Sequence, residues 1–172
     1  MERIREASPR LKARVFNLLL PQRVDNTYRG YKLGLWLFAL VVLLKLGVSL
    51  DSIFNGYTMA SSGDGIPLAT FTPAGVRTVV SLYALWGLAH LMICLLCLLV
   101  LVRYRSMIPF MFALLLLEHL SRKLILHFLP IAETSLGGQS PGISPFPYGF
   151  LALIIIGLAL SLRSRDNVQA QE

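Results

Sequence analysis

Four long apolar segments constrain the fold of this chain more than any other feature of its sequence. They cover residues 33–53, 76–102, 107–129 and 146–162. An apolar helix of about 20 residues, with a range of about 17–25, crosses the hydrocarbon core of a bilayer. The first three segments meet that length, and the fourth is at its lower limit. The pattern predicts an all-α integral membrane protein with four transmembrane helices, packed as a single bundle over residues 33–162.

Composition and charge support this class and argue against a nucleic-acid partner. Of the 172 residues, 55% are hydrophobic, compared with roughly 45–50% in an ordinary soluble domain. The net charge is +7, but the basic residues cluster at the ends of the apolar segments, where they orient membrane helices. The predicted partner is therefore a bilayer with an anionic inner leaflet.

The distribution of lysine and arginine predicts the orientation of the bundle. The basic residues outside the apolar segments include Arg3, Arg5, Arg10, Lys12, Arg14, Arg23, Arg29, Lys32, Arg103, Arg105, Arg163 and Arg165. The connections 51–75 and 130–147 contain neither lysine nor arginine. Because positively charged loops stay in the cytoplasm, segments 1–32 and 163–172 are both predicted to be cytoplasmic. The bias fits a bacterial cytoplasmic (inner) membrane.

The first 20 residues have the pattern of an amphipathic helix. Its apolar face carries Leu11, Val15, Leu18 and Leu19, and its polar face carries Arg10, Arg14 and Asn17. A basic helix of this kind lies in the membrane interface, and a short soluble helix packed under the bundle is the alternative. The first apolar segment begins too late, and is too long, for a signal-peptide core of about 7–15 residues. It is expected to act as an uncleaved anchor.

The third apolar segment carries an unusual set of ionisable residues. These are Glu118, His119, Arg122, Lys123 and His127. At about 100° per residue they fall opposite an apolar face, which carries Leu117, Leu120, Leu124 and Phe128. Ionisable groups at membrane depth are costly and mark the working part of a membrane protein. Ser106 is the expected N-cap of this helix, with Pro109 in its first turn.

Three ionisable residues on three different helices are predicted to lie at one depth. Counting 1.5 Å per residue from the cytoplasmic ends of the spans places Lys45, His90 and Glu118 near the middle of the membrane. A lone lysine there costs about 2.5–3.5 kcal/mol, so a Lys45–Glu118 ion pair is predicted. Arg122 is one turn beyond Glu118 on the same face, and Glu118 is expected to hold both cations.

A second charged layer is predicted nearer the outer surface. Asp51 lies near the level of Arg122 and Lys123, and His127 lies still further out. The buried cations would then be Lys45, Arg122 and Lys123, and the buried anions Glu118 and Asp51. The charges are nearly balanced, and one further anion could be accommodated. The alternative is that the ion pair only fixes the register of the helices and has no chemical role.

The second apolar segment carries an aromatic and polar stripe on one face. The stripe consists of Tyr83, Trp86, His90, Cys94 and Cys97. Tyr83 and Trp86 suit either a ring-shaped ligand such as a quinone or a helix interface, and the interface is favoured. His90 and His119 are candidate ligands of a b-type haem. Haem is not predicted, because His119 adjoins charged residues. The cysteines are interpreted as small buried side chains.

No catalytic motif or metal site is found, so no enzyme activity and no cofactor are predicted, and catalytic residues are unknown. The predicted function is a small polytopic membrane protein with a polar intramembrane site for a proton, a small ion, or a quinone or lipid head group. The site residues are Lys45, His90, Glu118, His119 and Arg122. The alternative is a non-catalytic accessory subunit of a larger membrane complex, in which these charges pair with a partner helix, and a b-type haem protein is a minor alternative. A homo-oligomer is also compatible with the sequence.

Overall fold

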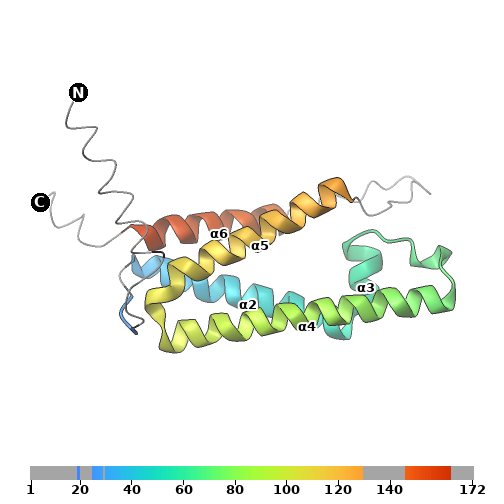
Figure 1. Cartoon of the computed structure of the whole chain (residues 1–172), viewed down its shortest axis with the longest axis horizontal. Helices are drawn as coiled ribbons and strands as arrows, with labels where there is room; N and C mark the ends of the chain where they lie inside the picture. The colour runs from blue at the N-terminus through green and yellow to red at the C-terminus, as the bar shows by residue number, and fades with distance from the viewer. Residues whose placement is uncertain (1–18, 20–24, 29, 130–145, 164–172) are drawn as a thin grey trace, which may run out of the picture.

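The computed structural model describes residues 19, 25–28, 30–129 and 146–163. Within these residues the chain is helical and has no strand, so the prediction of an all-α fold is confirmed for the described part of the chain. The long helices are α2 (Lys32–Phe54), α4 (Pro73–Arg103), α5 (Ile108–Phe128) and α6 (Phe146–Leu162), shown in Figure 1. The predicted amphipathic helix at the N-terminus, the connection 130–145 and the C-terminal tail lie outside the described residues.

Short helical turns occupy the connections on either side of α4. They are α3 (Gly56–Thr58), η1 (Met59–Gly63), η2 (Leu68–Thr70) and η3 (Arg105–Met107). The first two pack against α4, beyond the end of α2 (Figure 1). Gly65 takes a positive φ of 70°, a backbone conformation that favours glycine. The connection between α2 and α4 therefore folds back over α4 as a compact cap.

Helix α4 is longer than the second apolar segment. The Thr72 hydroxyl accepts a hydrogen bond from the Gly75 amide at 3.2 Å, and Pro73 fills the first helical position. Such capping starts a helix independently of apolar character. With 31 residues, α4 is about 46 Å long at 1.5 Å per residue, which exceeds a hydrocarbon core of about 30 Å.

Ser106 does not cap α5 as the sequence analysis expected. The residue before α5 is Met107, which makes no side-chain cap. The Ser106 hydroxyl instead donates to the Asp25 carbonyl at 2.9 Å and accepts from the Asp25 amide at 3.1 Å. These two bonds tie the segment before α2 to the connection between α4 and α5, because the hydroxyl can both donate and accept.

An apolar core lies where α2, α4, α5 and α6 approach the α4–α5 connection. It consists of Phe38, Val41, Val42, Cys97, Val100, Ile108, Met111, Phe112, Leu115 and Ile154. The Phe38 and Phe112 rings meet edge to face, with centroids 5.1 Å apart. A Cβ atom at Gly157 would overlap the Phe112 ring. The glycine therefore lets α6 pack closely on α5 at the centre of the core.

Helices α2 and α4 also approach each other closely, further from the α4–α5 connection. A Cβ atom at Gly87 would lie 2.9 Å from the Ser49 carbonyl oxygen and 2.9 Å from the Ser52 Cβ. The Ser49 hydroxyl is buried and donates to the Lys45 carbonyl at 2.7 Å. Small residues of this kind allow helix backbones to approach in membranes. They bring the α4 backbone close to α2 within one turn of Lys45.

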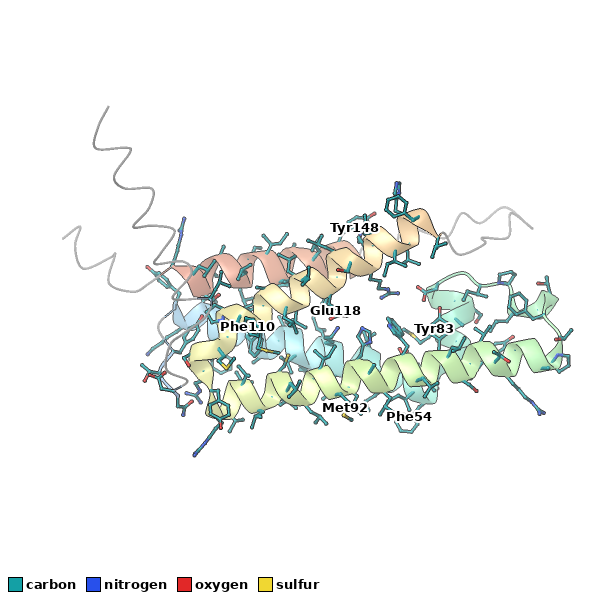
Figure 2. All side chains as sticks on the ribbon, in the orientation of Figure 1. Phe54, Tyr83, Met92, Phe110, Glu118 and Tyr148 are labelled. Carbon is teal, nitrogen blue, oxygen red and sulfur yellow. The ribbon has the colours of Figure 1, made fainter. Side chains whose placement is uncertain are left out.

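Much of the outer surface is apolar. Met92 and Phe54, labelled in Figure 2, are two of many large exposed apolar side chains. Two of the described helices, α2 and α4, are long and apolar enough to cross a membrane, and only 33% and 22% of their most apolar windows are buried. Helix α5 has the length but carries three charged residues, Glu118, Arg122 and Lys123. Helix α6 is apolar but shorter.

Candidate functional site

Polar side chains from α2, α4 and α5 meet directly beyond the apolar core. The Lys45 ammonium donates to both Glu118 carboxylate oxygens, at 2.7 and 2.9 Å. His90 Nε2 lies 2.8 Å from Glu118 Oε1. In Figure 2 the Glu118 side chain points from α5 toward the α2–α4 pair. Lys45 is 7% exposed and Glu118 is 27% exposed. The structure thus brings together the three residues that depth counting placed at one level, here named the Lys45–His90–Glu118 cluster.

The His90 imidazole is held from both sides. Its Nδ1 lies 3.0 Å from the Trp86 carbonyl oxygen, one turn earlier in α4. The Trp86 and His90 rings meet edge to face, with centroids 4.4 Å apart. These contacts on its own helix fix the ring, so that Nε2 faces Glu118 on α5.

The two contacts of the His90 ring bear on how many protons the cluster can hold. The Trp86 carbonyl oxygen and an ionised carboxylate only accept hydrogen bonds, and a neutral imidazole has one N–H. Both ring nitrogens face such an acceptor. The two contacts are therefore satisfied only when a further proton lies between Nε2 and Glu118 Oε1, on either atom. A proton at that place, together with the Lys45 ammonium, would give the Lys45–His90–Glu118 cluster a net charge of +1.

A second charged group lies one turn further along α5. Arg122 Nη2 lies 3.5 Å from Asp64 Oδ1, and its guanidinium sits 4.5 Å above the Trp86 ring. The Tyr83 hydroxyl donates to Asp64 Oδ2 at 2.5 Å. The expectation that Glu118 holds Arg122 is therefore wrong, because the cap over α4 supplies Asp64. Asp64 was not among the predicted site residues, although only two acidic residues occur in the connection 51–75.

The other predicted outer-layer partners make separate contacts. Asp51 Oδ1 accepts from Asn55 Nδ2 at 2.6 Å and forms no ion pair within the described part of the chain. Lys123 Nζ sits 4.1 Å over the Tyr148 ring, a cation–π contact. The His127 ring lies against the ring of Phe128, with centroids 5.5 Å apart. The prediction of Asp51 as the counter-ion is wrong, because Arg122 pairs with Asp64 and the Asp51 carboxylate bonds to Asn55 one turn away.

A small cavity adjoins the Lys45–His90–Glu118 cluster. Its volume is about 90 Å³. Its walls contain all five predicted site residues and three apolar side chains: Lys45, Val48, Trp86, His90, Glu118, His119, Arg122 and Phe150. His119 Nε2 is buried and has no hydrogen-bond partner among the described residues. The cavity therefore combines cations, an apolar wall and an unused ring nitrogen.

A second cavity lies beside the first. Its volume is about 230 Å³. It is lined by Asp64, Leu82, Tyr83, Trp86, Arg122 and Leu126. Trp86 and Arg122 belong to the walls of both cavities. The stacked Arg122–Trp86 pair therefore stands between the Lys45–His90–Glu118 cluster and the cap.

The geometry of the histidines and cysteines does not suit haem or redox chemistry. Both His90 nitrogens are engaged, and the cavity shared by His90 and His119 is far smaller than a macrocycle. Cys94 lies 3.7 Å from the Ser49 hydroxyl and Cys97 lies in the apolar core, both as buried free thiols. Among the described residues, no group of three or more histidine, cysteine or acidic side chains is placed to hold a metal ion.

Comparisons of the chain with protein-family models, with curated proteins and with solved structures find no match. The geometry of the cluster and of the two cavities is therefore the basis on which a function is inferred. Three observations bear on it: the two acceptors that face the His90 ring, the small size of the cavity and the apolar outer surface of the helices.

Proposed function

We propose that the chain is a four-span membrane protein whose working part is the Lys45–His90–Glu118 cluster, which binds and releases a proton within the bundle. The observation that carries this proposal is the position of the His90 ring between two hydrogen-bond acceptors, the Trp86 carbonyl and Glu118. The proposal has two parts, the arrangement of the spans and the chemistry of the cluster, and each has its own support and its own test.

The two faces of α5 support its role as a third span. Leu117, Leu120, Leu124 and Phe128 on its apolar face are all exposed. Glu118 and Arg122 on its other face bind side chains of the same chain. In a soluble bundle the apolar face would turn inward and the charges outward. The opposite arrangement suits a helix that has lipid on one side and protein on the other.

Charge and length support an orientation with both termini in the cytoplasm. The α4–α5 connection carries Arg103 and Arg105, whereas residues 51–75 carry no lysine or arginine. Counting about 20 residues from the basic end of α4 reaches Tyr83. Arg77 and the cap then lie beyond the hydrocarbon core on the outer side. This single outer arginine is outnumbered by the basic residues at the opposite ends of the helices.

The topology is tested by labelling single cysteines with a membrane-impermeant maleimide. The background replaces Cys94 and Cys97 with alanine, and single cysteines are introduced at Ser62, Gln139 or Ser164. We expect Ser62→Cys and Gln139→Cys to react in intact cells, and Ser164→Cys to react only after lysis. Reaction of Gln139→Cys only after lysis would leave two spans and contradict the four-span arrangement.

The cavity beside the cluster supports a proton or a small ion over larger ligands. A cavity of about 90 Å³ has room for a few water molecules. Pockets for drug-sized ligands measure about 300–1,000 Å³, which is well above the volume of this cavity. A proton shared by His90 and Glu118 needs no further room, and the cavity then holds the water or ion that exchanges with it.

The accessory-subunit alternative requires the charges of α5 to pair with a helix of another protein. Glu118 and Arg122 already have ion-pair partners within this chain. Lys123 is held by the Tyr148 ring. These internal contacts favour a bundle that functions by itself or as copies of itself.

The shared proton is tested by solid-state NMR of the full chain with ¹⁵N-labelled histidine and ¹³C-labelled glutamate in lipid. At neutral pH we expect His90 to have a protonated Nδ1 and a hydrogen-bonded proton between Nε2 and Glu118. The proton then appears either as a second N–H or as a neutral Glu118 carboxyl group. In Glu118→Gln, the amide can donate to Nε2, so we expect a neutral ring protonated only at Nδ1.

Asp51→Asn is the matched control, because the Asp51 carboxylate lies on α2 but hydrogen-bonds only to Asn55 in the described structure. This variant is expected to retain the wild-type His90 and Glu118 signals. A wild-type spectrum with an unprotonated Nε2 beside an ionised Glu118 would exclude the shared proton and with it the proposed proton site.

A further inference from the structure

The wall of the 90 Å³ cavity carries more positive than negative charge. Lys45 and Glu118 form an ion pair at one side of it, and the proposed His90 proton would bring that side to +1. Arg122 adds a second positive charge, and its counter-ion Asp64 lines the other cavity, where it also accepts from Tyr83. The cavity wall therefore contains two cationic side chains and one carboxylate, because Asp64 pairs with Arg122 from outside this cavity.

Two nitrogen-bearing groups in that wall have unfilled hydrogen-bonding capacity. The Arg122 guanidinium has five N–H donors. Within the described part of the chain it makes only the 3.5 Å ion pair with Asp64 and the stack on Trp86, and no hydrogen bond. His119 Nε2 is buried and lacks a hydrogen-bond partner among the described residues. Leaving a buried polar atom such as His119 Nε2 unpaired is costly, so a ligand that bonds to it is favoured. The Arg122 side chain is 41% exposed, and its donors are open to the same ligand.

We infer that the cavity beside the Lys45–His90–Glu118 cluster binds a small, planar, monovalent oxyanion, with Arg122 and His119 as its hydrogen-bond donors. The planar fork of a guanidinium matches two coplanar oxygens, which a carboxylate provides and a halide does not. A cavity of about 90 Å³ suits an anion of the size of formate, nitrate or bicarbonate.

This inference deepens the proposed function, and it rests on it because the shared His90 proton supplies part of the positive charge. The apolar parts of the wall strengthen the case. Val48, Trp86 and Phe150 line the cavity together with the charged groups. Hydrogen bonds to charged groups are stronger where such walls exclude water. A bound oxyanion would lie next to the Lys45–His90–Glu118 cluster, which in the proposed function donates and accepts a proton. An anion that is the conjugate base of a weak acid could exchange its proton with the cluster.

The test is saturation-transfer NMR with formate as the probe. The full chain is purified in a neutral detergent without anionic lipid, in a buffer whose only anion is large, such as gluconate. Protein methyl groups are saturated, and the loss of the formate proton signal is followed as the formate concentration is raised. We expect a saturable transfer that nitrate, a planar oxyanion of similar size, displaces.

Arg122→Gln is expected to lower the apparent affinity for formate by about tenfold or more, because it removes a charged, bidentate donor. His119→Phe, which keeps the size of the ring, is expected to weaken binding by a smaller factor. Arg105→Gln is the matched control. It removes the same charge near the α4–α5 connection, where the Arg105 side chain donates to the Leu101 carbonyl, and should bind formate as the wild type does.

Equal transfer in the wild type, Arg122→Gln and Arg105→Gln would overturn the inference, as would the absence of saturable transfer. Displacement of formate by phosphatidylglycerol in mixed micelles would assign the oxyanion site to a lipid head group and overturn the free-anion assignment. The failure of this inference and the failure of the proposed function are distinguishable. A protein that shows the shared His90 proton but no formate binding retains the proton site and loses only the anion.

Discussion

Replacing Glu118 with glutamine alone is expected to destabilise the bundle by about 3–5 kcal/mol, the usual result of removing one partner from a buried ion pair. The Lys45 ammonium is 7% exposed and bonds to both Glu118 oxygens. Without the carboxylate, Lys45 is a buried cation with no counter-ion. His90 also loses the acceptor of its shared proton. The loss is measured by titrating the folded protein in mixed micelles with SDS and following its helical circular dichroism.

The double variant Lys45→Met, Glu118→Gln separates the ion pair from general disruption of the site. With both charges removed, the desolvation cost of Lys45 disappears, so the double variant is expected to be more stable than Glu118→Gln alone by about 1–3 kcal/mol. A double variant no more stable than the single one would show that the pair does not couple α2 to α5. Asp51→Asn, with its exposed bond to Asn55, should change stability by no more than about 0.5 kcal/mol.

The central cluster followed from the sequence because two simple periodicities govern it. The rise of 1.5 Å per residue sets the depth of each residue, and the turn of 100° per residue sets its face. The rise and the turn per residue together predict that Lys45, His90 and Glu118 lie at one level in the bundle. The structure brings the same three side chains within hydrogen-bonding distance.

The outer layer did not follow, because its counter-ion comes from a connection and not from a helix. Depth along α2 predicts Asp51 as the counter-ion of Arg122, but the Asp51 carboxylate bonds to Asn55 one turn away. The counter-ion of Arg122 is Asp64, which the cap carries back over α4. Helical periodicity does not describe how a connection of that length folds, so neither Asp64 nor its bond with Tyr83 was accessible to the same counting.

The helix positions were easier to predict than their packing. All four long helices lie where the apolar segments predicted helices, and α4 differs most because the cap at Thr72 and Pro73 starts it earlier. The close approach of Gly157 to Phe112 and of Gly87 to Ser49 depends on which residues face each other across two helices. A single sequence gives the face of each helix but not the register between helices.

The same packing leads to the other large effect, at Phe112. Phe112→Ala is expected to destabilise the bundle by about 3–5 kcal/mol, because truncating a buried phenylalanine loses its contacts and leaves a cavity. The side chain is 0% exposed and meets Phe38 edge to face at 5.1 Å. The matched control is Phe128→Ala at the far end of α5, where the ring is 71% exposed. It should cost less than about 1 kcal/mol in the same SDS titration.

Gly157 makes the prediction at Phe112 more specific. A methyl group at Gly157 would overlap the Phe112 ring, so Gly157→Ala in the wild type should cost about 1–3 kcal/mol through overpacking. In the Phe112→Ala background the ring is absent, and the same methyl group fills part of the cavity. Gly157→Ala should there recover stability instead of reducing it. If the two substitutions add independently, Gly157 and Phe112 do not share one space, and α6 does not pack on α5 at this point.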